Sequence, residues 1–578
     1  IKRMIIYAMK KISNTSQTVF FALLMALTMI VTMVVSSHEH SHADTETTDE
    51  PDLPFGEYLA GRHALANNQY SIAADNYLKA LSLDPDNISL NQFTLAIMIT
   101  DGRFDDALRI SKRLIELDQG NDLARLMVFF DKTKNQQYDD ALVDADQLAS
   151  TGILNLINPF FRAWVLAEQG KMDELEKILN GFEEGASFNF FNYFQSGLIY
   201  EYLNDVEKAE NYYFMALGEQ GMTNLRAAEA YGKILSRQGK TEQAVAVFNE
   251  YIEKAPSNEQ LKAALLAAQN GEQFEPFVKT VDEGFSELFY TVATILMQDN
   301  VKRVATNYLQ YAMFFKPDFP LVHFLQAQIF ESDNYFEGAT EQLDKITKDS
   351  PLYFQSNLQR AWLLNQMELS DQALAAFKRL EAEYPDNRDV LNAIAEFYRT
   401  HERYSEAIPA YNKVVDTISQ ETERDWVLYY TRGIVFDQEK QWSDAERDFK
   451  KALELRPEQP MVLNYLAYSW VDQGIKYKEA KAMLERAVEL RPNDGYIIDS
   501  LGWALFKMGD VEEAVPVLER AAQLQTQDWA INDHLGDIYW VVGRKNEARF
   551  QWRHALSLTP DADKVDGIKD KIKNGYNR

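Results

Sequence analysis

Cysteine is absent from this sequence of 578 residues. Its absence excludes disulfides, thiol nucleophiles and cysteine-ligated metal sites, and it removes any lipid-acceptor cysteine near the amino terminus. Basic residues are also outnumbered, because 88 Asp and Glu face 59 Lys and Arg, for a formal net charge of -29. Nucleic-acid backbones are bound by clustered Lys and Arg, so we expect no nucleic-acid partner. An acidic surface instead favours basic proteins or peptides, or simply keeps a large chain soluble.

Charged residues are also missing from the run of residues 19–35, which follows four basic residues near the amino terminus. This is the layout of an export signal, and the small-residue sequence "SHA" at 41–43 resembles a cleavage site. The run also reaches the lower length limit for a membrane-spanning helix. We therefore expect a signal peptide or membrane anchor at 1–43 and an acidic linker at 44–53. The rest is expected in the periplasm or cell envelope, touching a membrane only through an uncleaved amino-terminal segment.

From residue 54 onward the dominant signal is a small residue that recurs with a period of 34 residues over long stretches. In the first unit Ala73 is followed by the large Tyr77, the small Ala80 and the unit-closing Pro85. Fixed periods of this length are typical of repeat architectures, and we count about fourteen units. The recurring positions are Ala73, Ala107, Ala141, Leu175, Ala209, Ala244, Ala305, Ala339, Ala373, Ala407, Ala445, Ala480, Ala514 and Ala548.

Each unit is predicted to form two helices, because apolar residues recur at three- and four-residue spacing on both sides of a short break. Small residues such as Gly433 and Ala452 are expected where the two helices of a unit approach each other closely. Pro457 should end a second helix, since proline cannot donate the next backbone hydrogen bond. One hairpin cannot bury both of its faces, but a stack of hairpins can.

These units resemble tetratricopeptide repeats, whose Gly or Ala, aromatic, Ala and Pro positions they match. The resemblance implies an all-α superhelical solenoid of about fourteen helix-turn-helix repeats. Two stretches depart from the repeat, one near 257–285 and a polar one near 416–425. The predicted parts are a signal or anchor at 1–43, a linker at 44–53, repeat arrays at 54–256, 286–419 and 426–560, an irregular seam at 257–285, and a capping helix at 561–578.

Motifs for catalysis are weak in this sequence. "HEHSH" at 38–42 matches a zinc-hydrolase pattern, but that pattern works only on a helix, and here it adjoins the export segment. "GKT" at 239–241 ends like a phosphate-binding loop but lacks the leading glycine, and it falls at the break between two repeat helices. His323, His534 and His554 have no defensible catalytic partners. We therefore predict no enzyme activity, no cofactor, and no catalytic or metal-binding residue.

The functional prediction is consequently a surface. The resemblance implies that the first helix of each repeat lines the concave face, with four positions of each helix pointing inward. In the last three repeats these positions select Asn464, Tyr468, Tyr496, Asp499, Trp503, Phe506, Asp533, Asp537 and Trp540.

Aromatic side chains beside carboxylates suit an extended, partly basic peptide or a partner helix. Tyr468, Trp503 and Trp540 could instead fill the core between repeats, because aromatic residues serve both purposes. Carboxylates are rarely buried without a partner, so we expect the three aspartates in this set to line a wet groove.

The last third of the sequence is similar to the end of a family of large bacterial envelope proteins with tetratricopeptide repeats. The likeness is carried by an insertion around 475–477 and by the run "DSLGW" at 499–503. One branch is the outer-membrane lipoprotein adaptor that activates a periplasmic carboxyl-terminal-processing protease and presents peptidoglycan hydrolases to it. The resemblance implies a similar scaffold with those partners. The missing cysteine departs from that branch and puts lipid tethering in doubt.

A second reading is a structural or assembly subunit of a secretion or polysaccharide-export machine, with no protease involved. An enzyme that uses the repeats only as a platform is a distant third, because the repeats leave no unassigned stretch long enough for another domain.

Overall fold

The computed structural model describes residues 55–118, 120–148, 152–182, 189–217 and 224–576. These residues form 30 α-helices and one three-residue 3₁₀ helix, and no strand occurs among them. The prediction of an all-α fold is confirmed. The predicted export segment at 1–43 and linker at 44–53 lie outside the described residues. Among the helices that the structure describes, none is long and apolar enough to cross a membrane.

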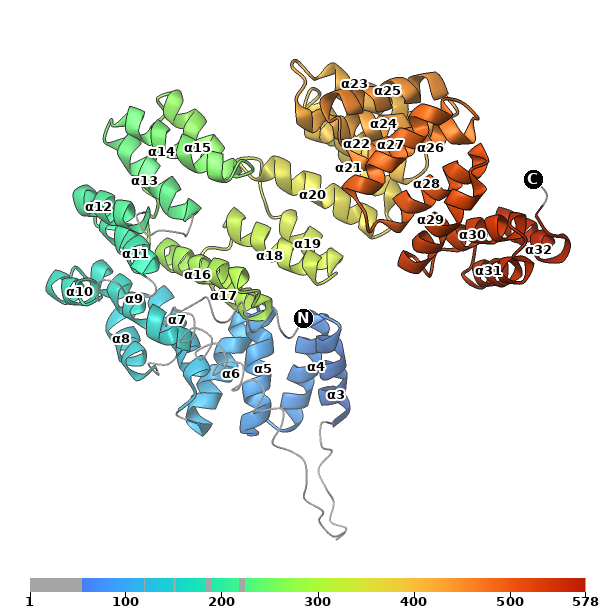
Figure 1. Cartoon of the computed structure of the whole chain (residues 1–578). Helices are drawn as coiled ribbons and strands as arrows, with labels where there is room; N and C mark the ends of the chain where they lie inside the picture. The colour runs from blue at the N-terminus through green and yellow to red at the C-terminus, as the bar shows by residue number, and fades with distance from the viewer. Residues whose placement is uncertain (1–54, 119, 149–151, 183–188, 218–223, 577–578) are drawn as a thin grey trace, which may run out of the picture. The chain divides into compact units, whose positions relative to one another are not determined.

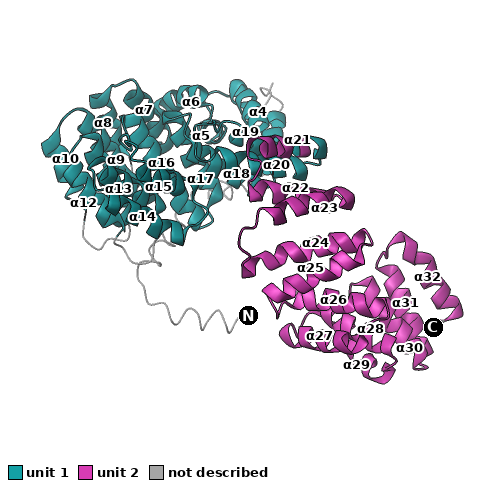
Figure 2. Cartoon of the chain, turned by 90° about the horizontal axis from the view of Figure 1, so that it is seen from above, with its two compact units in different colours: residues 1–373 teal, residues 374–578 magenta. Residues whose placement is uncertain are grey.

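The chain divides into two compact units, residues 1–373 and residues 374–578, which Figure 2 colours separately. The first unit begins with six helical hairpins. They pair α3 (Phe55–Ala66) with α4 (Tyr70–Leu83), α5 (Ile88–Thr100) with α6 (Phe104–Leu117), α7 (Asp122–Lys134) with α8 (Tyr138–Gln147), α9 (Gly152–Glu168) with α10 (Met172–Leu179), α11 (Asn189–Tyr202) with α12 (Val206–Leu217), and α13 (Leu225–Arg237) with α14 (Thr241–Lys254).

A single helix and two further hairpins follow in the first unit. They are α15 (Glu259–Gln269), then α16 (Val281–Gln298) with α17 (Lys302–Phe315), and α18 (Pro320–Ser332) with α19 (Phe336–Leu343). The next two helices are α20 (Tyr353–Gln366) and α21 (Ser370–Glu383), and the boundary between the units falls inside α21. The predicted seam at 257–285 thus holds α15 and the chain that leads into α16.

The second unit continues with five hairpins and a last single helix. They are α22 (Arg388–Thr400) with α23 (Tyr404–Asp416), α24 (Trp426–Gln438) with α25 (Trp442–Leu455), α26 (Pro460–Asp472) with α27 (Tyr477–Leu490), α28 (Gly495–Met508) with α29 (Val511–Leu524), α30 (Trp529–Val541) with α31 (Lys545–Ser557), and α32 (Ala562–Asn574). The 3₁₀ helix η1 (Glu423–Asp425) lies where the repeat period breaks. The described residues therefore hold thirteen hairpins, and with α20 and α21 the number of successive helix pairs equals the number of repeat units counted in the sequence.

The small residues of the repeat are buried where the two helices of each hairpin meet. All fourteen recurring positions, from Ala73 to Ala548, are 0% exposed, and alanine occupies each of them except Leu175. On the facing first helices the approach is equally close, because a Cβ atom at Gly433 would lie 2.7 Å from the ring of Phe449. The second helix of that hairpin ends at Leu455, two residues before Pro457, as predicted. The residues that recur with the repeat period therefore mark the places where helices pack closely.

The first helices of unit 1 pack against a later hairpin of the same unit. In Figure 1 the α16–α17 hairpin lies inside the arc formed by α5 to α13, and it packs against α5, α9 and α11. At its centre the ring of Phe289 lies 5.3 Å from that of Phe130 and 5.8 Å from that of Phe161. Thr100 on α5 also donates a 2.8 Å hydrogen bond to Asn307 on α17. The α16–α17 hairpin thus covers much of the inner side of these first helices.

Candidate functional site

The nine predicted binding residues lie on α26, α28 and α30, three consecutive first helices, as expected. Their exposure differs widely. Tyr496 is exposed at 54%, whereas Phe506 and Asp537 are each 1% exposed. Asn464, Tyr468, Asp533 and Trp540 are half-buried, and Asp499 and Trp503 are buried.

Asp533 and Asp537 bind the last helix of the chain. Lys571 on α32 places its Nζ 2.6 Å from an oxygen of Asp533 and 2.8 Å from an oxygen of Asp537. Trp552 donates its indole N–H to the other oxygen of Asp537 at 2.9 Å. Burial and the negative charge of Asp533 raise the pKa of Asp537 to about 6, although Lys571 acts in the opposite direction. These two carboxylates are therefore engaged inside the molecule.

Asp499 binds a histidine from the neighbouring repeat. His534 on α30 donates from Nδ1 to Asp499 at 3.0 Å, and its ring stacks on Trp503 with centroids 4.0 Å apart. Burial alone would lower the pKa of His534, but the carboxylate of Asp499 raises it above its usual value. The expectation of a wet groove is thus wrong for Asp499 and Asp537. Each is buried because a partner from another helix satisfies its charge, and sequence spacing does not reveal such partners.

The chain around α32 covers two further aromatic residues of this group, Phe506 and Trp540. The ring of Tyr576 lies 5.9 Å from that of Phe506. A Cβ atom at Gly575 would lie 2.0 Å from the ring of Trp540, so the backbone there passes directly over the indole. Ile568 of α32 is 2% exposed. Phe506 and Trp540 therefore pack against the carboxyl-terminal segment of their own chain.

A row of apolar side chains remains exposed beside this cluster. Val427, Met461 and Tyr496 are exposed at 46%, 37% and 54%, and each is the second residue of its helix, in α24, α26 and α28. These helices are neighbours, because Tyr430 of α24 and Tyr465 of α26 contact each other and α26 packs on α28. Sequence reasoning missed Val427 and Met461, although the repeat period places all three at equivalent positions. We call Val427, Met461 and Tyr496 the apolar row.

Two predicted residues beside the apolar row have unused hydrogen-bonding atoms. The buried side-chain oxygen of Asn464 has no hydrogen-bond partner among the described residues. Tyr468, one turn further along α26, is half-buried, and burial and the charge of Asp499 raise its pKa to about 12. Its hydroxyl is therefore neutral and able to donate at neutral pH. Together with the apolar row, these groups could contact an amphipathic segment of a partner.

The motifs weighed for catalysis have structural roles wherever they are described. Gly239 has a φ of +76° in the turn before α14, and Lys240 lies 2.7 Å from Glu210 in an ion pair. His323 is buried and hydrogen-bonds through its two ring nitrogens to Gln342 and to the carbonyl of Pro317. Over the described part of the chain, no group of three or more His, Cys, Asp or Glu could hold a metal ion. The histidine motif at 38–42 lies outside it.

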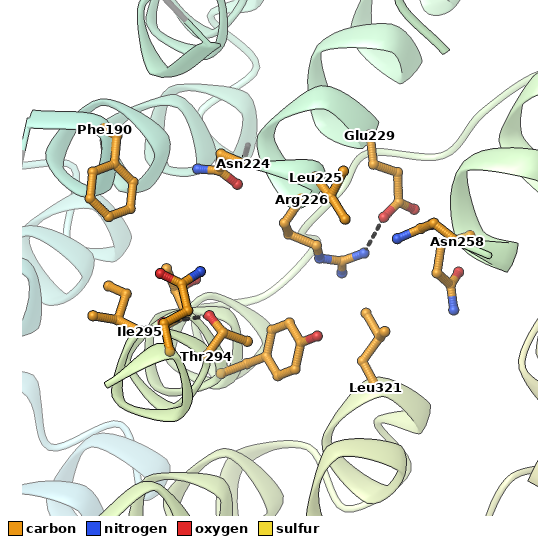
Figure 3. A pocket seen from close by; sticks show the side chains of 13 residues that line it. Phe190, Asn224, Leu225, Arg226, Glu229, Asn258, Thr294, Ile295 and Leu321 are labelled. Atoms are coloured by element: carbon orange, nitrogen blue, oxygen red, sulfur yellow. Dashed lines mark hydrogen bonds and ion pairs between the residues drawn. The ribbon is translucent and has the colours of Figure 1, made fainter. Parts of the chain in front are cut away.

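A cavity in unit 1 is a second candidate site, which the sequence did not suggest. It has a volume of about 460 Å³, and Figure 3 shows side chains of α13 facing those of α16 across it. The lining residues come from α11, α13, α15, α16 and α18 or the caps of these helices. They are Phe190, Asn224, Leu225, Arg226, Glu229, Asn258, Gln260, Tyr290, Thr291, Thr294, Ile295, Gln298 and Leu321.

An ion cluster forms one wall of this cavity. Arg226 binds Glu229 at 2.5 Å and reaches Glu287 of α16 at 3.1 Å, and Lys233 binds Glu229 at 2.6 Å. Burial would raise the pKa of Glu229, but the two cations lower it to about 2. The guanidinium of Arg226 also lies 4.1 Å from the ring centre of Phe277. Arg226 is therefore held in one position.

Comparisons with known proteins identify the repeats. Two family descriptions, both of the tetratricopeptide repeat, match residues 358–421, 430–495 and 500–560 in one case and 224–258 in the other. No curated protein matches the sequence significantly.

Several solved structures are similar to the chain. A tetratricopeptide repeat protein from Parabacteroides merdae shares 17% identity over 44% of this chain and 98% of its own, with a TM-score of 0.37. The Cut9–Hcn1 hetero-tetramer of the APC/C shares 14% identity over 91% of this chain and 97% of its own, with a TM-score of 0.37. Yeast Tom70 shares 14% identity over 90% and 95%, with a TM-score of 0.29.

Proposed function

Because the chain carries tetratricopeptide repeats, which act as protein-interaction scaffolds, we propose that it is a non-enzymatic scaffold of the bacterial cell envelope. Its partners are proteins or peptides, and the net charge of -29 favours basic ones. The export signal or anchor expected at 1–43 supports the envelope location.

The observation that carries this proposal is the apolar row of unit 2. Val427, Met461 and Tyr496 are exposed at equivalent positions of neighbouring first helices, where a partner segment that runs across these helices would bury all three. Tyr496 is the largest and most exposed of the three, and large aromatic residues contribute much of the binding energy at interfaces. The partner segment that fits this surface places apolar side chains on the row and hydrogen-bonding groups near Asn464 and Tyr468.

The finer proposal is an adaptor that presents substrates, such as peptidoglycan hydrolases, to a periplasmic carboxyl-terminal-processing protease. It is supported by the likeness of the last third of the sequence to envelope adaptors of this kind. A structural subunit of a secretion or polysaccharide-export machine is the competing outcome of the test below.

The test begins with the full chain as bait in cross-linked envelope extract, followed by identification of the captured proteins by mass spectrometry. We expect a processing protease together with wall hydrolases. The purified protease, one captured hydrolase and the full chain are then combined, and degradation of the hydrolase is followed with and without the chain. Faster degradation with the chain present is the expected result. Unchanged hydrolase half-lives, in vitro and after deletion of the gene, would rule out the adaptor role.

Two single substitutions test the surface itself. Tyr496→Ala should weaken hydrolase binding about 10-fold or more, because loss of an aromatic anchor typically costs at least ~1–2 kcal/mol. Phe550→Ala is the matched control, since Phe550 is 65% exposed on the second helix α31 and lies outside the row. Equal binding by the two variants would show that the apolar row is not the binding surface.

A further inference from the structure

One wall of the cavity in unit 1 includes equivalent positions of α13 and α15. Asn224 and Asn258 are 34 residues apart and cap α13 and α15. Arg226 and Gln260, two residues after each cap, also line the cavity. α16 and α18 supply the opposite wall through Tyr290 and other residues, so the space between these walls is a partly open cavity.

The charges around this cavity compensate one another. The cations Arg226 and Lys233 face the carboxylates Glu229 and Glu287 at hydrogen-bonding distance. No charge in this cluster is left over to attract an ion of either sign. A ligand that fits this wall is therefore uncharged, because an ion moved into a buried site needs a counter-charge to offset its lost hydration.

Several hydrogen-bonding groups around the cavity have no partner within the described residues. The side-chain oxygens of Asn224 and Asn258 accept bonds from backbone N–H groups, at Ala227 and Leu261, and this leaves both NH₂ groups as donors. The NH₂ group of Asn224 is buried and unpartnered. Burial raises the pKa of Tyr290 to about 12, so its hydroxyl is neutral and can donate or accept.

A ligand for this cavity must also contact apolar surface. Phe190, Leu225, Ile295 and Leu321 lie among the polar lining residues. A sugar ring has the matching character, because its hydroxyl groups both donate and accept while its C–H faces pack on apolar side chains. The volume of about 460 Å³ is in the range of small-molecule sites. The lining residues of α13 and α15 on one side and of α16 and α18 on the other can contact both faces of a small ligand.

We propose that this cavity binds a neutral carbohydrate of one or two rings, a role separate from the protein-binding surface of unit 2. Asn224 and Asn258 donate to oxygens of the sugar, and Tyr290 hydrogen-bonds to one of its hydroxyl groups. Arg226 is held in place by the carboxylates of Glu229 and Glu287 rather than by the ligand.

The experiment is isothermal titration of the full chain with the uncharged disaccharides chitobiose, cellobiose and maltose, and with N-acetyl-trialanine amide as an uncharged peptide. At least one disaccharide should bind. Tyr290→Phe removes only the hydroxyl, and Asn224→Ser removes the amide donor while keeping a residue that caps helices well. Each should weaken that binding about 3- to 10-fold, the usual effect of one lost hydrogen bond.

Asn121→Ser is the matched control, because Asn121 caps α7 through the same kind of bond to Ala124 but does not line the cavity. It should leave binding unchanged, and circular dichroism should show equal helicity in all variants. The proposal is overturned if none of the three disaccharides binds, or if Tyr290→Phe and Asn224→Ser bind as tightly as the control. Variant-sensitive binding of the capped peptide alone would also overturn it, in favour of a peptide site.

Discussion

Gly433 allows the helices of its hairpin to approach closely, since even one methyl group there would meet the ring of Phe449. We expect Gly433→Ala to destabilise unit 2 by about 1–3 kcal/mol, as overpacking of a filled core typically does. Urea unfolding of the full chain, followed by circular dichroism, measures the change.

Gly567 is the control for this substitution, because it also lies in a helix of unit 2 but has no heavy atom within 4 Å of an added Cβ. Gly567→Ala should stabilise the chain by ~0.5–1 kcal/mol, because alanine loses less backbone entropy in a helix. If Gly433→Ala leaves stability unchanged or raises it as Gly567→Ala does, the close packing at Gly433 does not matter energetically.

At the residue scale, the sequence predicts small and buried positions well and charged ones poorly. Ala73 and its counterparts are recognisable because their period coincides with the hairpin spacing. Asp537 looks like a surface residue, and it is buried only because Trp552 and Lys571 reach it from other helices. Such partners depend on how α30, α31 and α32 pack together, which sequence spacing does not show.

At the scale of the elements, the packing of α32 against α30 should depend on pH. The pKa of Asp537 is raised to about 6, above its value in an unfolded chain, so the native state takes up this proton first as pH falls. The contribution of Asp537 to stability is therefore largest at low pH, near 4 and below, and it is lost as pH rises through about 6. His534, whose pKa is also raised, acts in the same direction at somewhat higher pH.

Lys571→Met tests this docking. At pH 8 it should cost about 3 kcal/mol, because it leaves the charge of Asp537 buried without its cation. At pH 5 the cost should be smaller, since Asp537 is then protonated. Urea unfolding at the two pH values measures the difference, and Lys573→Met, at an exposed position of the same helix, is the control. A loss that is the same at both pH values would contradict the assigned role of Asp537.

The hairpins themselves could be predicted from the sequence, because each is held together by contacts within about 34 residues. The cavity could not. Its ion cluster joins Arg226 to Glu287, 61 residues away, and most of its opposite wall belongs to α16, which packs on the first helices of earlier repeats. Nothing in the repeat pattern distinguishes α16 and α17 from helices that simply continue a stack.

At the scale of a whole unit, the core of unit 1 should respond as a block to the loss of one side chain. Phe289 belongs to the same core cluster as residues of α5, α7 and α9. Phe289→Ala should lower the opening free energies of those helices together by about 3–5 kcal/mol. Hydrogen exchange followed by mass spectrometry reports these opening free energies segment by segment.

Phe248→Ala is the matched control for this experiment. Phe248 is also 0% exposed, but it belongs to a separate cluster formed by α13, α14 and α15. Its loss should affect those three helices and leave α5 to α9 protected. If Phe289→Ala loosens only α16 and α17, the inner packing does not join the repeats into one cooperative block.

The α16–α17 hairpin has a consequence for the order of folding. In a simple repeat array each unit contacts only its neighbours, so folding can begin anywhere and spread along the chain. Here Phe130 and Phe161 reach their aromatic partner Phe289 only after more than a hundred further residues have been synthesised. Non-local contacts slow folding, because the entropy of closing the loop is lost before the contact forms. The aromatic side chains of the early repeats therefore stay exposed during synthesis until residues 281–315 have been made. A chaperone that binds apolar surface would act during this interval.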